Sequence, residues 1–392
     1  MYTVFDLQGI YIKDKTVNPK PLLILGGYGL TGRLLAKLLL QETDLRLILV
    51  GRNIKKAEET ATELNRICQE ERVAGACADA SDAASLRRVF QGIDLVLVAS
   101  STAKYAKEVA TAALEMGIDY LDIQYSTQKV SQLKSMQKEI ETAGRCFITD
   151  GGFHPGLPAV LVRYAAQHFD ALEKAVVGSV IKEDWQSLSL ADDTLVELLE
   201  EINDFVPLVY KAGHWKKAGM YGMLDTLTMD FGREFGKQYC VPMFLEEMGP
   251  LPESIPSLKE TGFFVGGFNW FVDWLVLPLA AIGVKLWPRI ALRPMGRLTR
   301  WGLNTFSKPP YGTMLKAEVR GARDGRAKAM DITLYHKDGY MFTAIPIVAC
   351  LLQYLDGSIR KPGLWTQANI VEPDRLIRDM ERMGIEVKIQ IT

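Results

Sequence analysis

The feature that most constrains this chain is a regular alternation of short apolar runs with longer amphipathic stretches over residues 22–149. Short continuous apolar runs are typical of strands in a parallel sheet, because helices cover both faces of such a sheet. The runs that predict strands are residues 22–25, 45–50, 73–78, 95–99, 120–123 and 146–149, and the stretches that predict helices are 32–41, 55–67, 83–90, 103–116 and 130–142. The alternation therefore predicts an α/β fold that begins with a doubly wound parallel sheet.

After Gly152 the alternation ends, and the pattern favours a second, mixed α/β (α+β) domain. Residues 175–181 and 386–391 predict strands, and residues 314–320 and 327–335 predict a hairpin around the turn 321–325. Helices are predicted over residues 194–205, 343–355 and 374–383. Residues 206–260 give no clear pattern, and residues 1–20 predict a short extension with a small hairpin about Gly9. We expect a first domain over residues 18–152 and a second over 153–339.

A glycine-rich turn follows the first expected strand and opens the first expected helix. It consists of Gly26, Gly27, Tyr28, Gly29, Leu30, Thr31 and Gly32. Gly27, Gly29 and Gly32 satisfy G-x-G-x-x-G, and Gly26, Gly29 and Gly32 fit the looser G-x-x-G-x-x-G, so the register of the turn is open. In this strand–turn–helix context the motif predicts a Rossmann domain that binds a dinucleotide pyrophosphate at the helix N-terminus.

The end of the second expected strand favours NADP(H) over NAD(H). NAD-binding domains usually place an acidic residue there, where it binds the ribose 2′-hydroxyl. Here the strand ends in Gly51, Arg52 and Asn53, with no acidic residue. A carboxylate would repel a 2′-phosphate, whereas the guanidinium of Arg52 binds one bidentately. The alternative is that Arg52 is a surface residue near a helix start.

Polar residues after the third and fourth strands are further candidates for cofactor contacts. Asp79 is expected either to accept a hydrogen bond from the adenine amino group or to act as an N-cap or turn residue. Ser100, Ser101 and Thr102 lie where ligands bind in such sheets, and their hydroxyls either hold the nicotinamide ribose or cap the helix that follows.

Bulk composition excludes several classes of protein. The net charge of −1 gives no field that favours nucleic acid, so we expect no nucleic-acid partner. The five cysteines are scattered and odd in number, which argues against a disulfide framework and suits a reducing, cytoplasmic location. No metal-ligand spacing occurs, and the N-terminus has no signal-peptide pattern, so we expect no metal site and no secretion.

The segment 262–300 combines apolar and basic character. Its first part is rich in Phe, Trp and Leu but is interrupted by Pro278 and glycines, so a membrane-spanning role is doubtful. Lys285, Arg289, Arg293, Arg297 and Arg300 then recur at near-helical spacing, and no acidic residue occurs between Asp273 and Glu318. Because Pro288 and Pro294 interrupt the pattern, we expect short helical pieces. The segment is either a peripheral membrane contact, the mouth of an apolar pocket, or a core helix or dimer interface.

With these residues in hand, the chain resembles the saccharopine dehydrogenase-like oxidoreductase family. Besides the glycine turn and residues 50–53, the resemblance rests on Tyr120-Leu121-Asp122-Ile123, residues 152–156, Asp338-Gly339-Tyr340 with Thr343-Ala344, and residues 363–366. It implies an N-terminal Rossmann domain, a mixed α/β substrate domain, and a C-terminal segment, about 340–392, that packs back on the first domain. The cations expected of a true saccharopine site are not matched in full.

Three side chains are candidates for the chemistry: His154, Tyr125 and Lys104. His154 follows the sixth expected strand in a glycine-rich loop, and the other two follow the fifth and fourth strands. Each has a structural alternative.

The sequence therefore predicts an NADP-dependent oxidoreductase that transfers hydride to or from a C=N, C=C or C=O group of an apolar, lipid-like substrate. The alternatives are an amino-acid dehydrogenase of the saccharopine type and a membrane-associated scaffold that binds NADP(H) without catalysis. A homodimer through residues 153–339 stays open.

Overall fold

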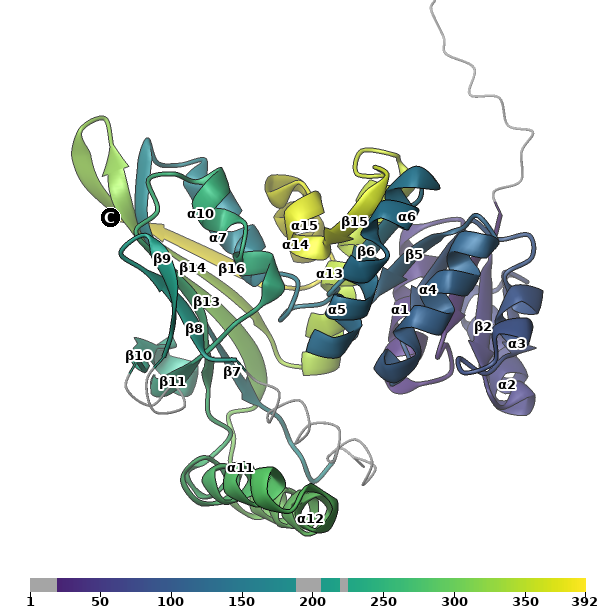
Figure 1. Ribbon diagram of the computed structural model, residues 1–392, viewed down its shortest axis with the longest axis horizontal. Helices are drawn as coiled ribbons and strands as arrows, with labels where there is room; N and C mark the ends of the chain where they lie inside the picture. Colours follow the sequence, from purple (N-terminus) through teal and green to yellow (C-terminus); the bar gives the residue numbers. More distant parts are fainter. Residues whose placement is uncertain (1–19, 188–205, 219–224) are drawn as a thin grey trace, which may run out of the picture.

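The computed structural model describes residues 20–187, 206–218 and 225–392, and within this part the chain forms two sheets side by side (Figure 1). The first sheet belongs to residues 22–149 and one later strand, and the second to residues 171–336 and the last strand. The predicted helix over 194–205 and the extension over 1–19 lie outside the described residues. The arrangement confirms the predicted α/β fold with a second, mixed domain.

The first sheet is parallel throughout and has the order β15-β6-β5-β4-β1-β2-β3. Its strands are β1 (Leu22–Leu25), β2 (Leu47–Gly51), β3 (Val73–Cys77), β4 (Leu95–Val98), β5 (Asp119–Asp122), β6 (Cys146–Thr149) and β15 (Gly363–Thr366). The order reverses between β1 and β4, which makes the carboxyl ends of these two strands the expected place for a ligand.

Helices cover both faces of this sheet and explain why its strands are continuous apolar runs. On β1, Leu22 and Ile24 enter one core with α1 (Leu30–Glu42), whereas Leu23 and Leu25 enter the other with α3 (Ala83–Val89) and α4 (Ala106–Glu115). The remaining helices of this domain are α2 (Ile54–Cys68), the short 3₁₀ helix η1 (Ala103–Tyr105), α5 (Thr127–Ser135) and α6 (Gln137–Thr142). The helix predicted over 130–142 is therefore two helices that meet at Met136.

The second sheet is mixed and has the order β10-β11-β12-β7-β13-β14-β16, with β8 and β9 attached at β12. Its strands are β7 (Ala171–Lys182), β8 (Leu208–Lys211), β9 (His214–Lys217), β10 (Leu227–Asp230), β11 (Lys237–Met243), β12 (Glu260–Gly266), β13 (Gly312–Arg323), β14 (Arg326–His336) and β16 (Glu386–Ile391). The predicted hairpin is β13–β14, whose two-residue turn has positive φ at Asp324 (51°) and Gly325 (71°), as a type I′ turn requires. Four of the strands and part of a fifth lie in residues 206–260, where the sequence showed no pattern.

Short helices connect these strands. They are α7 (Pro158–Ala166), α9 (Gly232–Phe235), η3 (Glu246–Met248) and α10 (Leu251–Ser254). Of these, α7 packs against β7 and β13, so the first element after the Rossmann strands already belongs to the core of the second sheet.

The C-terminal segment returns to the first domain. Helix α13 (Gly339–Leu355) packs against α1, and β15 then pairs with β6 at the edge of the first sheet. Helices α14 (Gln367–Ile370) and α15 (Pro373–Arg382) follow, and β16 closes the far edge of the second sheet against β14.

The apolar and basic segment divides into two different structures. Residues 262–266 belong to β12, where Phe263 and Phe264 are buried in the second sheet. The rest forms a helical hairpin of η4 (Val272–Val276, a π-helical turn), α11 (Leu277–Leu286) and α12 (Pro288–Phe306). The expectation of short pieces was wrong for α12, which begins at Pro288 but continues through Pro294. Within the described residues, no helix has the length and apolar character needed to cross a bilayer.

Candidate functional site

The glycine turn between β1 and α1 is built around the carbonyl oxygen of Gly26. Gly26 has φ +90°, and the N–H of Gly29 donates to its carbonyl oxygen at 2.9 Å. A Cβ on Gly32 would lie 2.2 Å from the same oxygen, so only glycine fits there. Gly26, Gly29 and Gly32 therefore meet around one carbonyl oxygen, as the spacing G-x-x-G-x-x-G requires. Gly27 is constrained separately, since a Cβ there would lie 2.8 Å from Cα of Leu49.

The N-terminus of α1 offers free hydrogen-bond donors beside this turn. Gly29 is its N-cap, and no side chain accepts a hydrogen bond from the first turn of the helix. The first residue, Leu30, is exposed, while Thr31 is half-buried. Unpaired N–H groups and the positive end of the helix dipole attract an anion such as a pyrophosphate.

The end of β2 forms the neighbouring wall of the site. The ring of Tyr28 lies on Gly51, where a Cβ would be 2.4 Å from Cε1 of Tyr28. The Tyr28 hydroxyl accepts a hydrogen bond from the backbone N–H of Asn53 at 3.2 Å, and the Asn53 side chain caps α2 through the N–H of Lys56 at 3.1 Å. Arg52 stands between these anchored residues with an exposed side chain. The geometry thus fixes the backbone around Arg52 and leaves its guanidinium available to solvent.

Asp79 lies beside Arg52 and is held in a turn. Its carboxylate accepts hydrogen bonds from the N–H of Ser81 at 2.9 Å and from the Ser81 hydroxyl at 2.7 Å. These bonds and, less strongly, the charge of Arg52 lower the pKa of Asp79. Asp82, not Asp79, caps α3. Of the two predicted roles, the described contacts match the turn residue.

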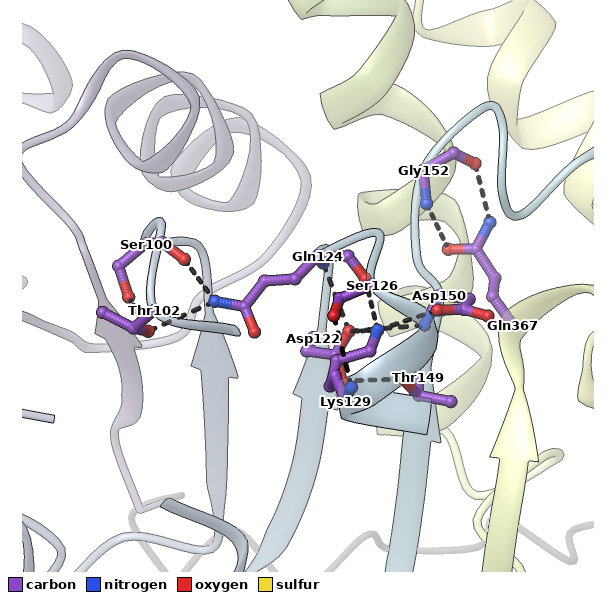
Figure 2. Close-up of polar contacts among 10 residues, drawn as sticks. All are labelled: Ser100, Thr102, Asp122, Gln124, Ser126, Lys129, Thr149, Asp150, Gly152 and Gln367. Carbon is purple, nitrogen blue, oxygen red and sulfur yellow. Dashed lines mark hydrogen bonds and ion pairs between the residues drawn. The ribbon is translucent and has the colours of Figure 1, made fainter. Parts of the chain in front are cut away.

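The loops after β4 and β5 are joined by the amide of Gln124 (Figure 2). Its Nε2 donates to the carbonyl oxygen of Ser100 and, at 3.2 Å, to the hydroxyl of Thr102. The hydroxyls of Ser100 and Thr102 bond each other at 2.8 Å, and Ser101 is exposed. No side chain caps the helical turn that begins at Ala103.

One polar atom of the Gln124 side chain makes none of these hydrogen bonds. Its Oε1 is buried and has no hydrogen-bond partner within the described residues. A buried acceptor without a donor is costly, so its position at the carboxyl edge of β4 and β5 favours a ligand that donates to it.

Behind these loops lies a fully buried ionic cluster centred on Lys129 of α5. Its Nζ donates to Oδ1 of Asp122 and Oδ1 of Asp150, each at 2.7 Å, and to the carbonyl oxygen of Gln124 (Figure 2). Asp122 also accepts from the hydroxyl of Thr149 at 2.7 Å. Burial raises the pKa of Asp150, while the two carboxylates raise the pKa of Lys129 despite its burial. The cluster ties together the ends of β5 and β6 and the loops that follow them.

The loop after β6 is held in a conformation that few residues adopt. Asp150 has φ +58°, and Gly152 and Gly156 have φ +136° and +126°. The Gln367 amide accepts from the N–H of Gly152 at 3.3 Å and donates to the Gly152 carbonyl at 3.0 Å. The buried carboxylate of Glu247 accepts from the N–H of Gly156 at 2.5 Å. The C-terminal segment and η3 thus fix this loop from outside the first domain.

His154, at the tip of this loop, is not arranged as a proton donor. Neither ring nitrogen is accessible or has a partner within the described residues, and burial lowers its pKa to about 3. The ring packs edge-on against Phe153, with ring centroids 4.0 Å apart, and against Phe263 of β12 at 5.4 Å. Phe153 in turn stacks on Phe342 of α13 at 5.1 Å. An aromatic cluster therefore joins the loop to the second sheet.

The other two catalytic candidates lie on the loops that Gln124 connects. Tyr125 follows Gln124, is half-buried, and packs against the main core. Lys104 is exposed on η1, with its Nζ 5.0 Å from the centroid of the Tyr105 ring. Nothing in these contacts brings Lys104, Tyr125 and His154 together.

Sequence reasoning missed the residues that hold the site in place. Asp122, Gln124, Lys129, Asp150 and Gln367 received no role, although Asp122 and Asp150 each follow an apolar strand. That position was the available signal, because polar groups at the carboxyl ends of parallel strands meet at one edge. Gln367 gave none, since it reaches Gly152 from 215 residues away.

The residues present fit a dinucleotide. An uncapped helix N-terminus beside the glycine turn suits the pyrophosphate. The exposed Arg52 at the end of β2 suits a ribose phosphate, and the carboxylate of nearby Asp79 is held by hydrogen bonds from Ser81. The unpartnered Oε1 of Gln124 lies at the other end, by the loop after β4.

Comparison with known proteins agrees with this site. Residues 22–148 match the family model described as the saccharopine dehydrogenase NADP binding domain. At the level of sequence, no curated protein matches the chain.

Among solved structures, apo histidine-tagged saccharopine dehydrogenase (L-Glu forming) from Saccharomyces cerevisiae is similar in fold. It has a TM-score of 0.69 and 15% identity, over 95% of this chain and 100% of that one. Two others are more distant. A meso-dapdh mutant with DAP from Clostridium tetani has 13% identity and a TM-score of 0.46, over 91% of this chain and 95% of that one. A myo-inositol dehydrogenase from Corynebacterium glutamicum has 12% identity and a TM-score of 0.44, over 93% of this chain and 94% of that one.

Proposed function

We propose that this chain, whose residues 22–148 match the saccharopine dehydrogenase NADP binding domain, is an NADP-dependent oxidoreductase with an apolar, lipid-like substrate. When bound, the nicotinamide supplies the hydride chemistry, and the protein supplies binding, orientation and exclusion of water. The observation that carries the proposal is the glycine turn at the uncapped start of α1, next to the exposed Arg52 at the end of β2.

Each part of the site has a task under this proposal. The N–H groups at the start of α1 bind the pyrophosphate, and Arg52 binds the 2′-phosphate of the adenine ribose. The loop held by Gln124 binds the nicotinamide end, where Oε1 of Gln124 accepts a hydrogen bond. Lys129 is a positioning residue, because it touches only the groups that fix this loop and the loop after β6.

The substrate class is inferred from the side chains beside the loop after β6. Phe153 packs against His154 and Phe342, and His154, whose pKa burial lowers to about 3, packs against Phe263. This apolar surrounding of the loop is more compatible with a hydrocarbon chain than with the charged carboxylates of an amino acid, which need cationic partners.

Cofactor choice is tested by changing Arg52 and measuring the binding of NADPH and NADH by calorimetry. Arg52→Ala should weaken NADPH binding by about tenfold or more, since hydrogen bonds to charged groups contribute about 1.5–3 kcal/mol. NADH binding should change much less. Arg66→Ala, which changes an exposed arginine in the last turn of α2, is the matched control. Equal small losses for both cofactors in Arg52→Ala would remove Arg52 from the phosphate site.

Catalysis is tested by substrate-dependent oxidation of NADPH. We expect turnover with long-chain enoyl or carbonyl compounds and little with imino acids formed from amino acids and keto acids. Turnover restricted to the imino acids would favour the amino-acid dehydrogenase. Tight NADPH binding without turnover on either panel would favour the non-catalytic scaffold.

A further inference from the structure

The helical hairpin, residues 270–306, projects from the second sheet. Figure 1 shows α11 and α12 lying against each other below the second domain. The hairpin leaves the sheet after β12 and returns to it at β13, and the ring of Trp274 packs against Tyr239 of β11 with centroids 5.7 Å apart. Most of its exposed apolar side chains lie beyond this contact.

The inner face of the hairpin is already filled. Phe271, Val272, Val276 and Leu303 form its own small core. Phe271 stacks on Phe306 with ring centroids 4.9 Å apart and meets the edge of Trp301 at 5.2 Å. A Cβ on Gly302 would lie 2.7 Å from the Phe271 ring, so the two helices are in close contact at this point.

The outer face is apolar as well, and it faces solvent. The large exposed apolar side chains on the hairpin are Trp270, Trp274, Leu275, Leu279, Leu286, Trp287 and Trp301, with Trp270 at 62% and Trp287 at 61% exposure. Trp270 and Trp274 lie four residues apart and are exposed, whereas Val272 and Val276 are buried. A helix that is apolar all round is expected inside a core or a membrane, not against water.

Basic side chains lie next to these apolar side chains, and the same stretch of sequence holds no acidic residue that could neutralise their charge. Between Asp273 and Glu318 no acidic residue occurs. Arg293, Arg297 and Trp301 follow one another at intervals of four along α12, and all three are exposed. Exposed tryptophan and leucine next to arginine match the interface of an anionic bilayer, where rings enter the headgroup layer and guanidinium groups meet phosphates.

We propose that the hairpin is an in-plane membrane anchor that binds the surface of an anionic lipid bilayer. Its outer tryptophan and leucine side chains enter the interface, and Arg293 and Arg297 bind lipid phosphates. The absence of a membrane-spanning helix from the described residues agrees with a helix that lies in the surface. This inference does not depend on the oxidoreductase proposal, because it uses no residue of the cofactor site.

A second copy of the chain is a poorer occupant of the same face. Two-fold pairing brings the same patch of each subunit together. Arg293 and Arg297 of one copy would then approach those of the other, with no acid of the hairpin's outer face to separate them. Anionic lipid supplies the missing charge.

The test is flotation of the full chain with vesicles of phosphatidylcholine alone or mixed with phosphatidylserine, at low and high salt. The wild type should float with the mixed vesicles at low salt and lose binding as salt rises. Arg293→Gln with Arg297→Gln should weaken binding about thirtyfold, at about a factor of five for each cation near the surface. Arg320→Gln with Arg326→Gln, two exposed arginines on the β13–β14 hairpin, is the matched control and should bind as the wild type does.

Insertion is tested separately with brominated lipids, which quench tryptophan at the interface. Fluorescence of the wild type should be quenched, and Trp270→Ser with Trp274→Ser should lose part of that quenching. Binding without quenching would reduce the hairpin to an electrostatic contact and overturn the anchor. No flotation at low salt overturns the proposal outright. In that case a dimer in sedimentation, broken by the same tryptophan changes, would assign the face to a second copy.

Discussion

Strand β1 and the helical hairpin are both strongly apolar in sequence, yet they meet different surroundings. All four side chains of β1 are 3% exposed or less, because helices cover both faces of its sheet. In the hairpin one face of the helices is covered, and the other leaves tryptophan and leucine in solvent. Apolar sequence therefore predicts that a segment avoids water but does not say whether protein or lipid replaces the water.

The two regions also treat charge differently. In the first domain Lys129 is fully buried and balanced by two carboxylates within hydrogen-bond distance. On the hairpin Arg293 and Arg297 are exposed, and the nearest acidic residues in sequence are Asp273 and Glu318. A buried charge needs an opposite charge or hydrogen-bond partners within the folded protein, whereas an exposed charge is solvated by water and can bind a partner later.

The largest effect that would sharpen this contrast comes from removing the buried cation. Lys129→Met should lower the free energy of unfolding by about 3–5 kcal/mol, because Asp122 and Asp150 would be left buried without a counter-charge. Denaturant unfolding measures the change. Lys134→Met, on the same helix but in an exposed ion pair with Glu246, should cost less than about 1 kcal/mol. Equal losses in the two variants would contradict the buried role of Lys129.

A somewhat smaller effect separates the inner and outer faces of the hairpin. Phe271→Ala should destabilise the hairpin by about 3 kcal/mol, since the ring fills the space between its helices. Trp287→Ala, in the exposed turn between α11 and α12, should change stability by no more than about 0.5 kcal/mol in the absence of lipid. Hydrogen exchange of α11 and α12 reports this local stability. A large loss in Trp287→Ala would show that the outer face is packed, which breaks the comparison.

The effect that is smallest at neutral pH concerns His154, because it appears only in acid. Its pKa is about 3 in the folded protein and about 6.5 in an unfolded chain, so the unfolded state takes up the proton first. Stability is therefore complete above about pH 6.5 and falls as the pH drops, by up to about 1.4 kcal/mol for each pH unit. His154→Phe should remove this part of the acid sensitivity, as seen in unfolding curves between about pH 6.5 and 4.

Exposed His214 provides the control, and His214→Gln should leave the slope unchanged. A wild-type slope retained in His154→Phe would show that the ring is hydrated and titrates normally. His154 would then return as a candidate proton donor.

The sequence predicted the first sheet well and the second only in part, for physical reasons. Strands buried on both faces are continuous apolar runs, and such runs are easily recognised in a sequence. Strand β11 is half-exposed, contains Pro242 and carries lysine at its start, so no period of two stands out. Lys129 was hidden for the opposite reason, because lysine in a helix usually faces solvent and only the fold brings two carboxylates to it.

For the candidate site, the glycine turn could be predicted from the sequence, and the distant residues that hold the neighbouring loop could not. The glycine turn and Arg52 are contiguous with the strands that position them, so local sequence carries the signal. The contacts of Gln367 and Glu247 with the loop after β6 span 215 and 91 residues, a separation that no local pattern records.

The chain crosses between the two sheets three times and thereby restricts how they can move relative to each other. The chain passes from the first sheet to the second after β6, back to the first at β15, and again to the second at β16. Any closure of one domain on the other must bend all three connections together, which favours small shearing movements over a wide swing. Loss of the last thirty residues, 363–392, would strip an edge strand from each sheet, so neither half is expected to survive alone as a truncated fragment.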